Sequence, residues 1–251
     1  MLVMNGKYID GIIFRNDINR DSFLNDIPAV KYLAEYKEIS FTHDVTFFIG
    51  ENGTGKSTLL EAIAVAYGFN AEGGTKNFNF STEATHSELY EHITISRSRY
   101  AKDGYFLRAE SFYNVASNID KLDRESALGG SIIDSYGGIS LHKQSHGESF
   151  LALVQNRFGG HGLYILDEPE AALSPVRLMT LMAEIQDLVK HDSQFIIATH
   201  SPILMAFPNS QIYELSDHGI ADVQYKETDH YLITRRFLEN PEQMLKHLFE
   251  E

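Results

Sequence analysis

One stretch of the chain decides its fold, and it reads Val45-Thr46-Phe47-Phe48-Ile49-Gly50-Glu51-Asn52-Gly53-Thr54-Gly55-Lys56-Ser57-Thr58. The first five residues are an apolar run rich in β-branched side chains, which predicts a buried strand. The next eight residues, Gly50 to Ser57, match the pattern G-x-x-x-x-G-K-[ST] of a phosphate-binding loop. Apolar residues then recur at helical spacing, at Leu59, Leu60, Ile63 and Tyr67. The stretch therefore predicts a strand, a glycine-rich loop and a helix, in the order that the pattern requires.

The loop supplies the expected nucleotide-binding residues, which are Asn52, Gly53, Thr54, Gly55, Lys56, Ser57 and Thr58. Its glycines let consecutive backbone N–H groups point at phosphate oxygens, and the helix N-terminus adds the positive end of its dipole. We expect Lys56 to reach the β- and γ-phosphates of ATP and Ser57 to ligate Mg²⁺. The alternative interpretation is an ordinary glycine turn that caps a helix.

A second stretch is an apolar strand that runs into two adjacent carboxylates, Leu163-Tyr164-Ile165-Leu166-Asp167-Glu168-Pro169. Charges at the end of a buried strand need partners, and a metal ion is one such partner. We expect Asp167 to hold Mg²⁺ and Glu168 to orient or deprotonate the attacking water. The competing interpretation is a strand that ends in a solvated acidic turn, and the phosphate-binding loop upstream argues against it.

His200 follows another buried strand, Phe195-Ile196-Ile197-Ala198. Open α/β sheets bind their ligands at the carboxyl ends of the strands. His200 is therefore expected at the same sheet edge as Glu168, in contact with the γ-phosphate. Glu168 and His200 are the predicted catalytic residues.

Fully apolar strands separated by helices predict an α/β fold, a P-loop NTPase with a mostly parallel sheet covered by helices. Ser174 and Pro175 supply an N-cap and a first-turn proline for a helix that carries Met179, Met182, Ile185 and Val189. We expect one domain over residues 1–251. An inserted lobe is expected at about 71–157, where Ser, Asn, Gly and charged residues are frequent up to about residue 145.

The composition excludes several classes of protein. No cysteine is present, so neither a disulfide framework nor a cysteine-ligated metal site can form. The formal charge of −14 opposes general binding of nucleic acid. No apolar run approaches the ~18 residues that span a membrane. We expect a cytoplasmic protein without a membrane segment.

The tightest group of basic residues is Arg97, Arg99, Lys102 and Arg108. We interpret these residues as solvated charges on two strands joined by a turn at Asp103-Gly104, because this dipeptide is typical of hairpin turns. A local basic patch for binding an anionic partner is the alternative.

Together these motifs resemble the ABC-type ATPase head, and specifically the compact soluble AAA-family ATPases related to the chromosome-maintenance, recombination and double-strand-break-repair heads. The resemblance covers nearly the whole chain. Its signature, Leu-Ser-Gly-Gly-Gln at a helix start, is matched by Gln144-Ser145-His146-Gly147-Glu148-Ser149. Ser145 and Gly147 agree with the signature, whereas His146 and Glu148 depart from it. Phosphate loop, signature, acidic strand and histidine follow one another in the family's order.

The resemblance implies an antiparallel β portion, a lobe that carries the signature, and an ATP-dependent homodimer in which Ser145 and Gly147 contact the nucleotide of the opposite subunit. In place of the family's Mg²⁺-ligating Gln, this sequence has Glu110 as the candidate ligand. The family's Ser-Ala-Leu-Asp loop reads Ala-Ala-Leu-Ser here, with Ser174 in place of Asp. Arg15 resembles an arginine that lies near the phosphates, and a surface arginine is the alternative.

The leading functional hypothesis is an ATPase that dimerises around ATP and Mg²⁺ and couples opening and closing to a protein partner, in DNA repair, recombination or defence. The alternatives are the ATP-binding subunit of a membrane transporter and an ATP-gated binding module with little hydrolysis. A self-sufficient nuclease is a further alternative, but it would need a second carboxylate-rich metal site, and the sequence shows none. The sequence leaves the partner and any DNA binding open. Long coiled-coil arms are excluded, since about 75 residues separate the first helix from the signature and they lack heptads.

Overall fold

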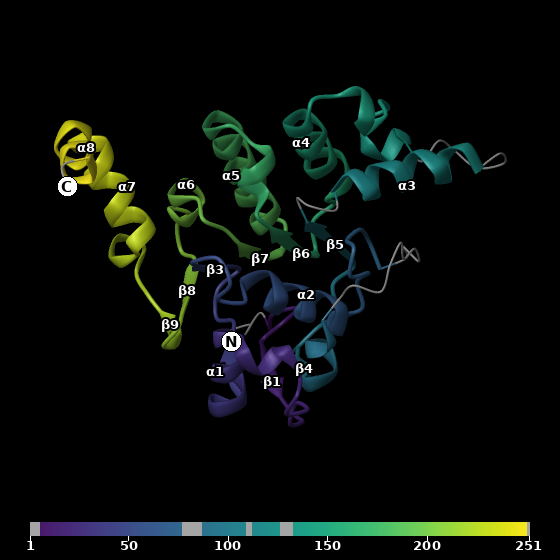
Figure 1. Cartoon of the computed structure of the whole chain (residues 1–251). Helices are drawn as coiled ribbons and strands as arrows, with labels where there is room; N and C mark the ends of the chain where they lie inside the picture. The colour runs from purple at the N-terminus through teal and green to yellow at the C-terminus, as the bar shows by residue number, and fades with distance from the viewer. Residues whose placement is uncertain (1–5, 77–86, 109–111, 126–132, 250–251) are drawn as a thin grey trace, which may run out of the picture.

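Strands form two sheets in the computed structural model, which describes residues 6–76, 87–108, 112–125 and 133–249 (Figure 1). The smaller sheet is antiparallel, in the order β2 (Glu38–Ser40), β1 (Gly11–Phe14) and β4 (Ile93–Ser96). The larger sheet has the order β5 (Asp103–Arg108), β6 (Gly162–Asp167), β7 (Gln194–Ala198), β3 (Val45–Gly50), β8 (Gln211–Ser216) and β9 (Gly219–Asp222). Its neighbouring strands are parallel except for β8 and β9. The predicted fold class is confirmed.

Helices connect these strands, and their ends carry the expected signals. Ser174 caps one helix, where its Oγ accepts a hydrogen bond from the Arg177 N–H at 3.4 Å and Pro175 is the first helical residue. Gly68, with φ 106°, ends another in the left-handed conformation. The bounds are α1 (Pro28–Tyr36), α2 (Lys56–Tyr67), α3 (Phe112–Glu125), α4 (His146–Arg157), α5 (Pro175–Lys190), α6 (Pro202–Met205), α7 (Asp229–Glu239) and α8 (Pro241–Phe249).

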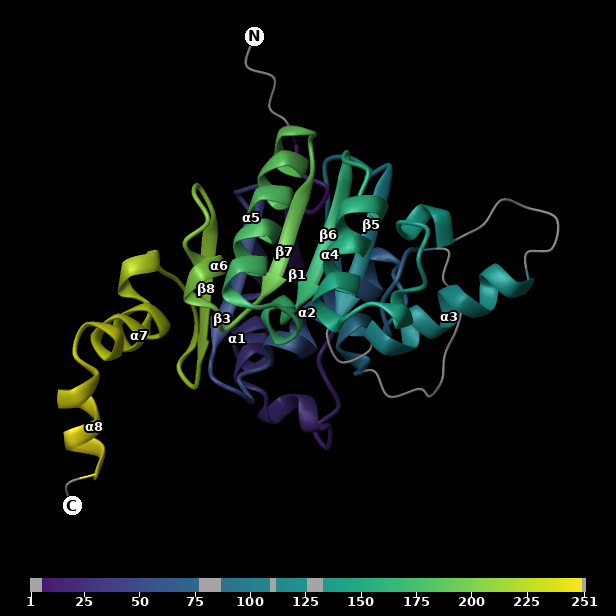
Figure 2. The same cartoon turned by 90° about the horizontal axis from the view of Figure 1, so that it is seen from above.

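The larger sheet has a hydrophobic core on each face, because successive residues of a strand point to opposite sides. Phe47 of β3 belongs to the core that α3, α4 and α5 share. The next residue, Phe48, belongs to the core that α1, α2 and the smaller sheet share. Figures 1 and 2 show the sheet between these two layers. The helix after the phosphate loop, α2, and the helix of the signature, α4, therefore lie on opposite faces of the same sheet.

The predicted hairpin turn at Asp103-Gly104 is wrong, because these two residues open β5. This strand pairs with β6 in the larger sheet, whereas β4 pairs with β1 in the smaller one. Residues 105–107 are large and completely buried, and their burial outweighs the local turn preference. At Gly104 a Cβ atom would lie 2.9 Å from the Leu163 carbonyl oxygen, so the position requires glycine.

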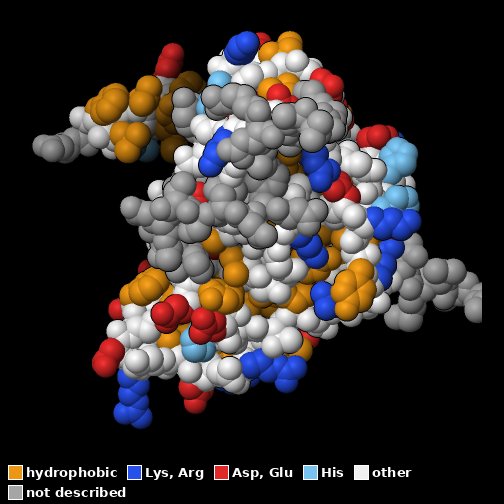
Figure 3. Space-filling view, turned by 90° about the vertical axis from the view of Figure 1, so that its right-hand side faces the viewer, with side chains coloured by type: hydrophobic (Ala, Val, Ile, Leu, Met, Phe, Trp, Pro, Cys, Tyr) orange, Lys and Arg blue, Asp and Glu red, His pale blue; other side chains and the backbone are white. Residues whose placement is uncertain are grey.

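The interpretation of the basic residues as solvated strand charges is wrong for two of them. Arg99 donates two hydrogen bonds of 2.7 Å to Asp192. Nη1 of Arg108 donates to Glu61 Oε2 at 2.6 Å. On the face that Figure 3 presents, Lys and Arg side chains stand in small groups separated by neutral and acidic surface.

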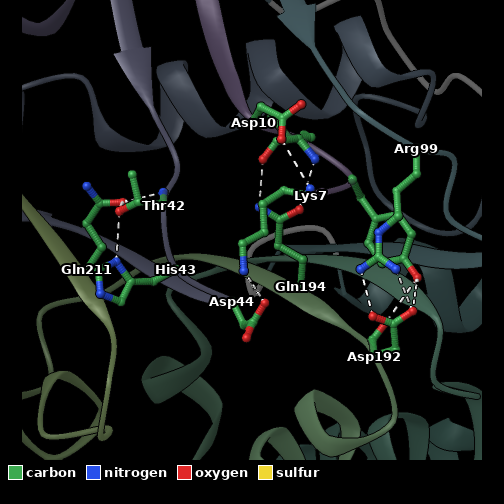
Figure 4. Close-up of polar contacts among 11 residues, drawn as sticks. Lys7, Asp10, Thr42, His43, Asp44, Arg99, Asp192, Gln194 and Gln211 are labelled. Carbon is green, nitrogen blue, oxygen red and sulfur yellow. Dashed lines mark hydrogen bonds and ion pairs between the residues drawn. The ribbon is translucent and has the colours of Figure 1, made fainter. Parts of the chain in front are cut away.

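Polar contacts join the segments next to β1 and β4 of the smaller sheet to the amino ends of the larger sheet's strands (Figure 4). The Gln194 side chain bonds both backbone groups of Ile9, at 2.9 Å and 2.8 Å. Lys7 pairs with Asp44, and Arg99 reaches Asp192. These contacts fix the two sheets to each other and leave the carboxyl ends of β3, β6 and β7 for the site described below.

Two parts of the chain extend this frame. Residues 71–157 contribute β4 to the smaller sheet, β5 to the larger sheet, and α3 and α4 to one layer, so the division into one domain with an inserted lobe stays a prediction. α7 and α8 lie beyond β9 at the edge of the molecule and have no buried residue (Figures 1 and 2). Within the described ranges, every helix is too short or too polar to cross a bilayer.

Candidate ATP-binding and hydrolysis site

The phosphate loop joins β3 to α2 and owes its shape to glycine. Gly50, Gly53 and Gly55 have φ values of 134°, 85° and 101°, which residues with a side chain rarely adopt. The loop is also pinned internally, since the Thr54 hydroxyl donates to the Glu51 carbonyl oxygen at 2.9 Å. Asn52 and Gly53 are exposed at its tip, and Ser57 and Thr58 are half-buried in the first turn of α2. The result is a strand, a left-handed glycine loop and a helix N-terminus, the arrangement that binds phosphate.

Lys56 lies inside the loop, with 4% of its surface exposed. Its Nζ donates to the carbonyl oxygens of Gly50 at 2.8 Å and Glu51 at 3.0 Å. Burial lowers the pKa of this ammonium group, and the carboxylates of Glu168 and Asp167 oppose the shift. The positive charge is thus held among the loop carbonyls and faces the acidic end of β6.

Ser57 and Asp167, the predicted metal ligands, lie in contact with each other. The Ser57 hydroxyl donates to Asp167 Oδ1 at 3.1 Å, and only 7% of the Asp167 side chain is exposed. One hydroxyl and one carboxylate fit Mg²⁺, which binds through one or two carboxylates together with water and phosphate oxygens. Glu110, the third predicted ligand, lies outside the described residues. Among the described residues, no group of three or more His, Asp or Glu side chains forms a separate metal site.

Arg108 reaches this pair from the end of β5, a contact that the sequence did not predict. Its Nε lies 3.6 Å from Asp167 Oδ2, while its Nη1 donates to Glu61 of α2. The guanidinium group therefore partners the buried carboxylate on the side away from Ser57 and links β5, β6 and α2.

Glu168 and His200 also meet, at the ends of the neighbouring strands β6 and β7. Glu168 Oε1 lies 3.6 Å from His200 Nε2, and 39% of the Glu168 side chain is exposed. Glu168 has φ 50°, which is unusual for a residue with a side chain, and its N–H donates to the Ala198 carbonyl oxygen at 3.0 Å. Burial lowers the pKa of His200, and the nearby Lys56 adds to this. A neutral imidazole and a water-accessible carboxylate thus face the loop lysine.

Two further side chains hold His200, and no sequence motif indicated either of them. His200 Nδ1 lies 3.2 Å from Nε2 of His230, in the first turn of α7. The His200 backbone N–H donates to the carboxylate of Glu170. Both contacts join residues 30 positions apart in the sequence, and no motif spans them.

The signature residues begin α4, where Ser145 is the N-cap. The Glu148 carboxylate accepts hydrogen bonds from the Ser145 N–H at 3.0 Å and the Ser145 hydroxyl at 2.6 Å. At Gly147 a Cβ atom would come within 2.8 Å of the Ala172 carbonyl oxygen, so only glycine fits. The departure from the family at Glu148 is thus a helix-capping interaction, and the His146 ring packs edge-on against Phe112.

Arg177, in the first turn of α5, was not predicted to contact the signature. Its Nη1 donates to Ser145 Oγ at 3.3 Å and its Nη2 to Glu148 Oε1 at 3.1 Å. The side chain is 35% exposed. The signature therefore presents a hydroxyl and a guanidinium group together, on the opposite face of the sheet from α2.

The fold and the motifs are those of the ABC-type P-loop ATPases. More particularly, the chain belongs to the AAA-domain family, whose model matches residues 29–156, just over half of the chain. A second model, described as an AAA domain and associated in its description with a type IV toxin–antitoxin system, matches residues 149–206.

Two curated relatives are ATP-binding proteins by name. The chain is 28% identical over 188 residues to the ribose import ATP-binding protein RbsA of Halalkalibacterium halodurans, a match that covers 65% of this chain and 36% of the relative. It is 27% identical over 165 residues to the cytochrome c biogenesis ATP-binding export protein CcmA of Aliivibrio fischeri. That match covers 62% of this chain and 78% of the relative. The chain thus spans little more than a third of the ribose-import relative's length.

Solved structures with a similar fold include CbiO1 of Clostridium perfringens, from the ABC transporter complex CbiONQ, at 16% identity and TM-score 0.48. That match covers 98% of this chain and 100% of the other. The SMC head domain of Thermotoga maritima is 18% identical, with a TM-score of 0.40, over 74% of this chain and 92% of the other.

Proposed function

We propose that this protein binds ATP with Mg²⁺ and hydrolyses it. One observation carries the proposal: Lys56, Ser57, Asp167, Glu168 and His200 gather at the carboxyl ends of β3, β6 and β7. Phosphoryl transfer depends mainly on positioning and charge stabilisation, and these side chains offer both. ATP hydrolysis fits this set better than any reaction that needs a covalent nucleophile.

Each side chain has a role in this proposal. The loop backbone and Lys56 bind the β- and γ-phosphates, and Ser57 and Asp167 hold the metal. A Mg²⁺ ion bound there would neutralise charge on the phosphates. Glu168 orients the attacking water and accepts its proton, for which its partial exposure is suitable. His200 donates a hydrogen bond to the γ-phosphate from Nε2.

We further propose that two copies share each nucleotide, head to tail. The support is the placement of the signature: α4 packs in the layer opposite to α2, so one chain presents the phosphate loop and Ser145 on separate faces of its sheet. Closing two copies would bring Ser145, Gly147 and Arg177 of one to the ATP of the other. The dimer would form with ATP and open after hydrolysis, and this motion would be coupled to a protein partner.

A second candidate is the ATP-binding subunit of a membrane transporter, which the names of the curated relatives favour. It shares the same ATP chemistry and differs in the partner. An ATP-gated module with little hydrolysis is less well supported, since Glu168 stands beside His200. The cytoplasmic location stays part of the proposal, and DNA repair, recombination and defence remain its open settings. Purification of the protein with its native partners distinguishes these settings.

The shared site predicts that ATP turnover per chain depends on protein concentration. Below the dimer dissociation constant the rate per chain should rise in proportion to concentration, and above it the rate should level off, because only dimers hold complete sites. Phosphate release at saturating Mg²⁺-ATP, measured over roughly a hundredfold range of protein concentration, tests this. Omission of Mg²⁺ is the control for specific turnover. A constant rate per chain, with light scattering showing monomers throughout, would contradict the shared site.

A further inference from the structure

His230 contacts His200 from an element that is remote in the sequence. His230 Nε2 lies 3.2 Å from His200 Nδ1, and the two ring centroids are 5.4 Å apart. The position of His230 is well defined, because it follows the buried N-cap Thr228, whose Oγ1 accepts from the Tyr231 N–H at 3.2 Å. His230 also lines a cavity of about 230 Å³ beside the phosphate loop, together with Gly50, Glu51 and Thr54.

The contact with His230 and the nearby Glu168 carboxylate together favour one position for the proton of His200. In a hydrogen bond between two neutral imidazoles, one nitrogen donates and the other accepts. If His230 Nε2–H donates, His200 Nδ1 accepts and the proton of His200 sits on Nε2, which faces the Glu168 carboxylate at 3.6 Å. In the reverse arrangement, the lone pair of Nε2 would face that carboxylate and repel it. The first arrangement is therefore the stable one.

Both rings lie where the neutral form is favoured. Burial lowers the pKa of His230, and the neighbouring His200 lowers it further. Burial likewise lowers the pKa of His200. Within the described residues, His200 Nε2 is buried and makes no hydrogen bond. It is thus a proton donor that is held in place beside Glu168 and has no hydrogen-bond acceptor of its own in the part of the chain that the structure describes.

We propose that His230 is a positioning residue for ATP hydrolysis: it holds the His200 ring through Nδ1 and keeps the proton on Nε2, directed into the active site. This inference rests on the proposed ATPase function and adds a residue to it. Glu170 fixes the backbone of His200 and His230 fixes its ring. Since His230 belongs to α7, the placement of that helix becomes a determinant of turnover.

Kinetics of three variants test the proposal. Replacing His230→Ala should lower kcat about tenfold or more, the usual cost of losing a group that orients an active-site histidine. The KM for Mg²⁺-ATP should change less than about twofold, because the phosphate loop provides most of the ATP binding and the hydrogen bond from His200 strengthens as charge develops in the transition state. His230→Gln should recover most of kcat, since its amide N–H replaces Nε2–H. His247→Ala, on the exposed face of α8, is the matched control and should behave like the unmodified protein.

Nitrogen NMR of the histidine rings provides a measurement that does not depend on turnover. Long-range ¹H–¹⁵N spectra distinguish the ring nitrogen that carries a proton, and a His200→Gln spectrum assigns the signal of His200. We expect the Nε2–H form in the unmodified protein and in His230→Gln, and a mixture of both forms in His230→Ala. If all three show the same form of His200, or if His230→Ala keeps full kcat, the positioning role is wrong. Absence of ATPase activity in the unmodified protein would instead reject the proposed function.

Discussion

Replacement of Lys56 by alanine is expected to abolish productive ATP binding. The ammonium group is the cation that the loop holds at its centre, between the carbonyl oxygens of Gly50 and Glu51. The loop amides alone cannot neutralise a triphosphate. Two charged hydrogen bonds from Lys56 to the β- and γ-phosphates are worth roughly 3–6 kcal/mol together. Their loss corresponds to an ATP affinity about 10² to 10⁴ times weaker.

Calorimetric titration with Mg²⁺-ATP measures this loss. Lys31→Ala, which removes an exposed lysine from α1, is the matched control and should bind ATP as the unmodified protein does. Circular dichroism of Lys56→Ala checks that the fold survives, because the side chain is buried. Unchanged ATP affinity and turnover in Lys56→Ala would show that the phosphate site lies elsewhere.

The substitution Glu168→Gln should slow hydrolysis by about a hundredfold or more and leave ATP binding intact. Glutamine keeps the shape of the side chain but cannot accept the proton of the attacking water. Size-exclusion chromatography in Mg²⁺-ATP should then show more dimer for this variant than for the unmodified protein, because closed dimers no longer hydrolyse their ATP.

Glu35→Gln, at an exposed position of α1, controls for the loss of one negative charge. Hydrolysis at the full rate by Glu168→Gln would reject Glu168 as the catalytic base. If Glu168→Gln hydrolyses ATP slowly but forms no more dimer than the unmodified protein, Glu168 keeps its role as catalytic base. The trapped dimer is then removed from the proposal.

Local patterns in the sequence predicted the centre of the fold. The strands near 45–49, 163–166 and 195–198 are confirmed, because each is an uninterrupted apolar run bounded by a glycine loop, an acidic pair or a histidine. The N-cap at Ser174 is confirmed for a similar reason, since a cap and a following proline act within one helical turn. Such signals need no knowledge of distant residues.

What the sequence did not predict depends on contacts between distant residues. Asp103-Gly104 looks like a turn, but Asp103 accepts hydrogen bonds from Tyr164 at 2.8 Å and Arg157 at 3.0 Å, which tie it to other elements. His230 and Arg177 occupy ordinary helix N-termini and become part of the candidate site only when α7 and α5 pack. No local pattern marks either one as functional, so tertiary packing had to reveal them.

The shared active site is the central claim, and mixing two inactive variants tests it most directly. Ser145→Arg leaves the phosphate loop intact but places a bulky cation where the opposite subunit must close. Lys56→Ala disables the loop and leaves the signature intact. Each variant alone should be inactive, and Ser145→Arg should still bind ATP as a monomer.

A dimer of one copy of each variant has one site with both lesions and one site with neither. Random pairing of equal amounts makes half of the dimers mixed, so the mixture should recover up to about a quarter of the unmodified activity per chain. The measurement is the ATPase rate of the equimolar mixture compared with each variant alone. We predict activity in the mixture and none in the separate variants. A mixture as inactive as its components, or full activity of Ser145→Arg at concentrations where it is monomeric, would contradict the shared site.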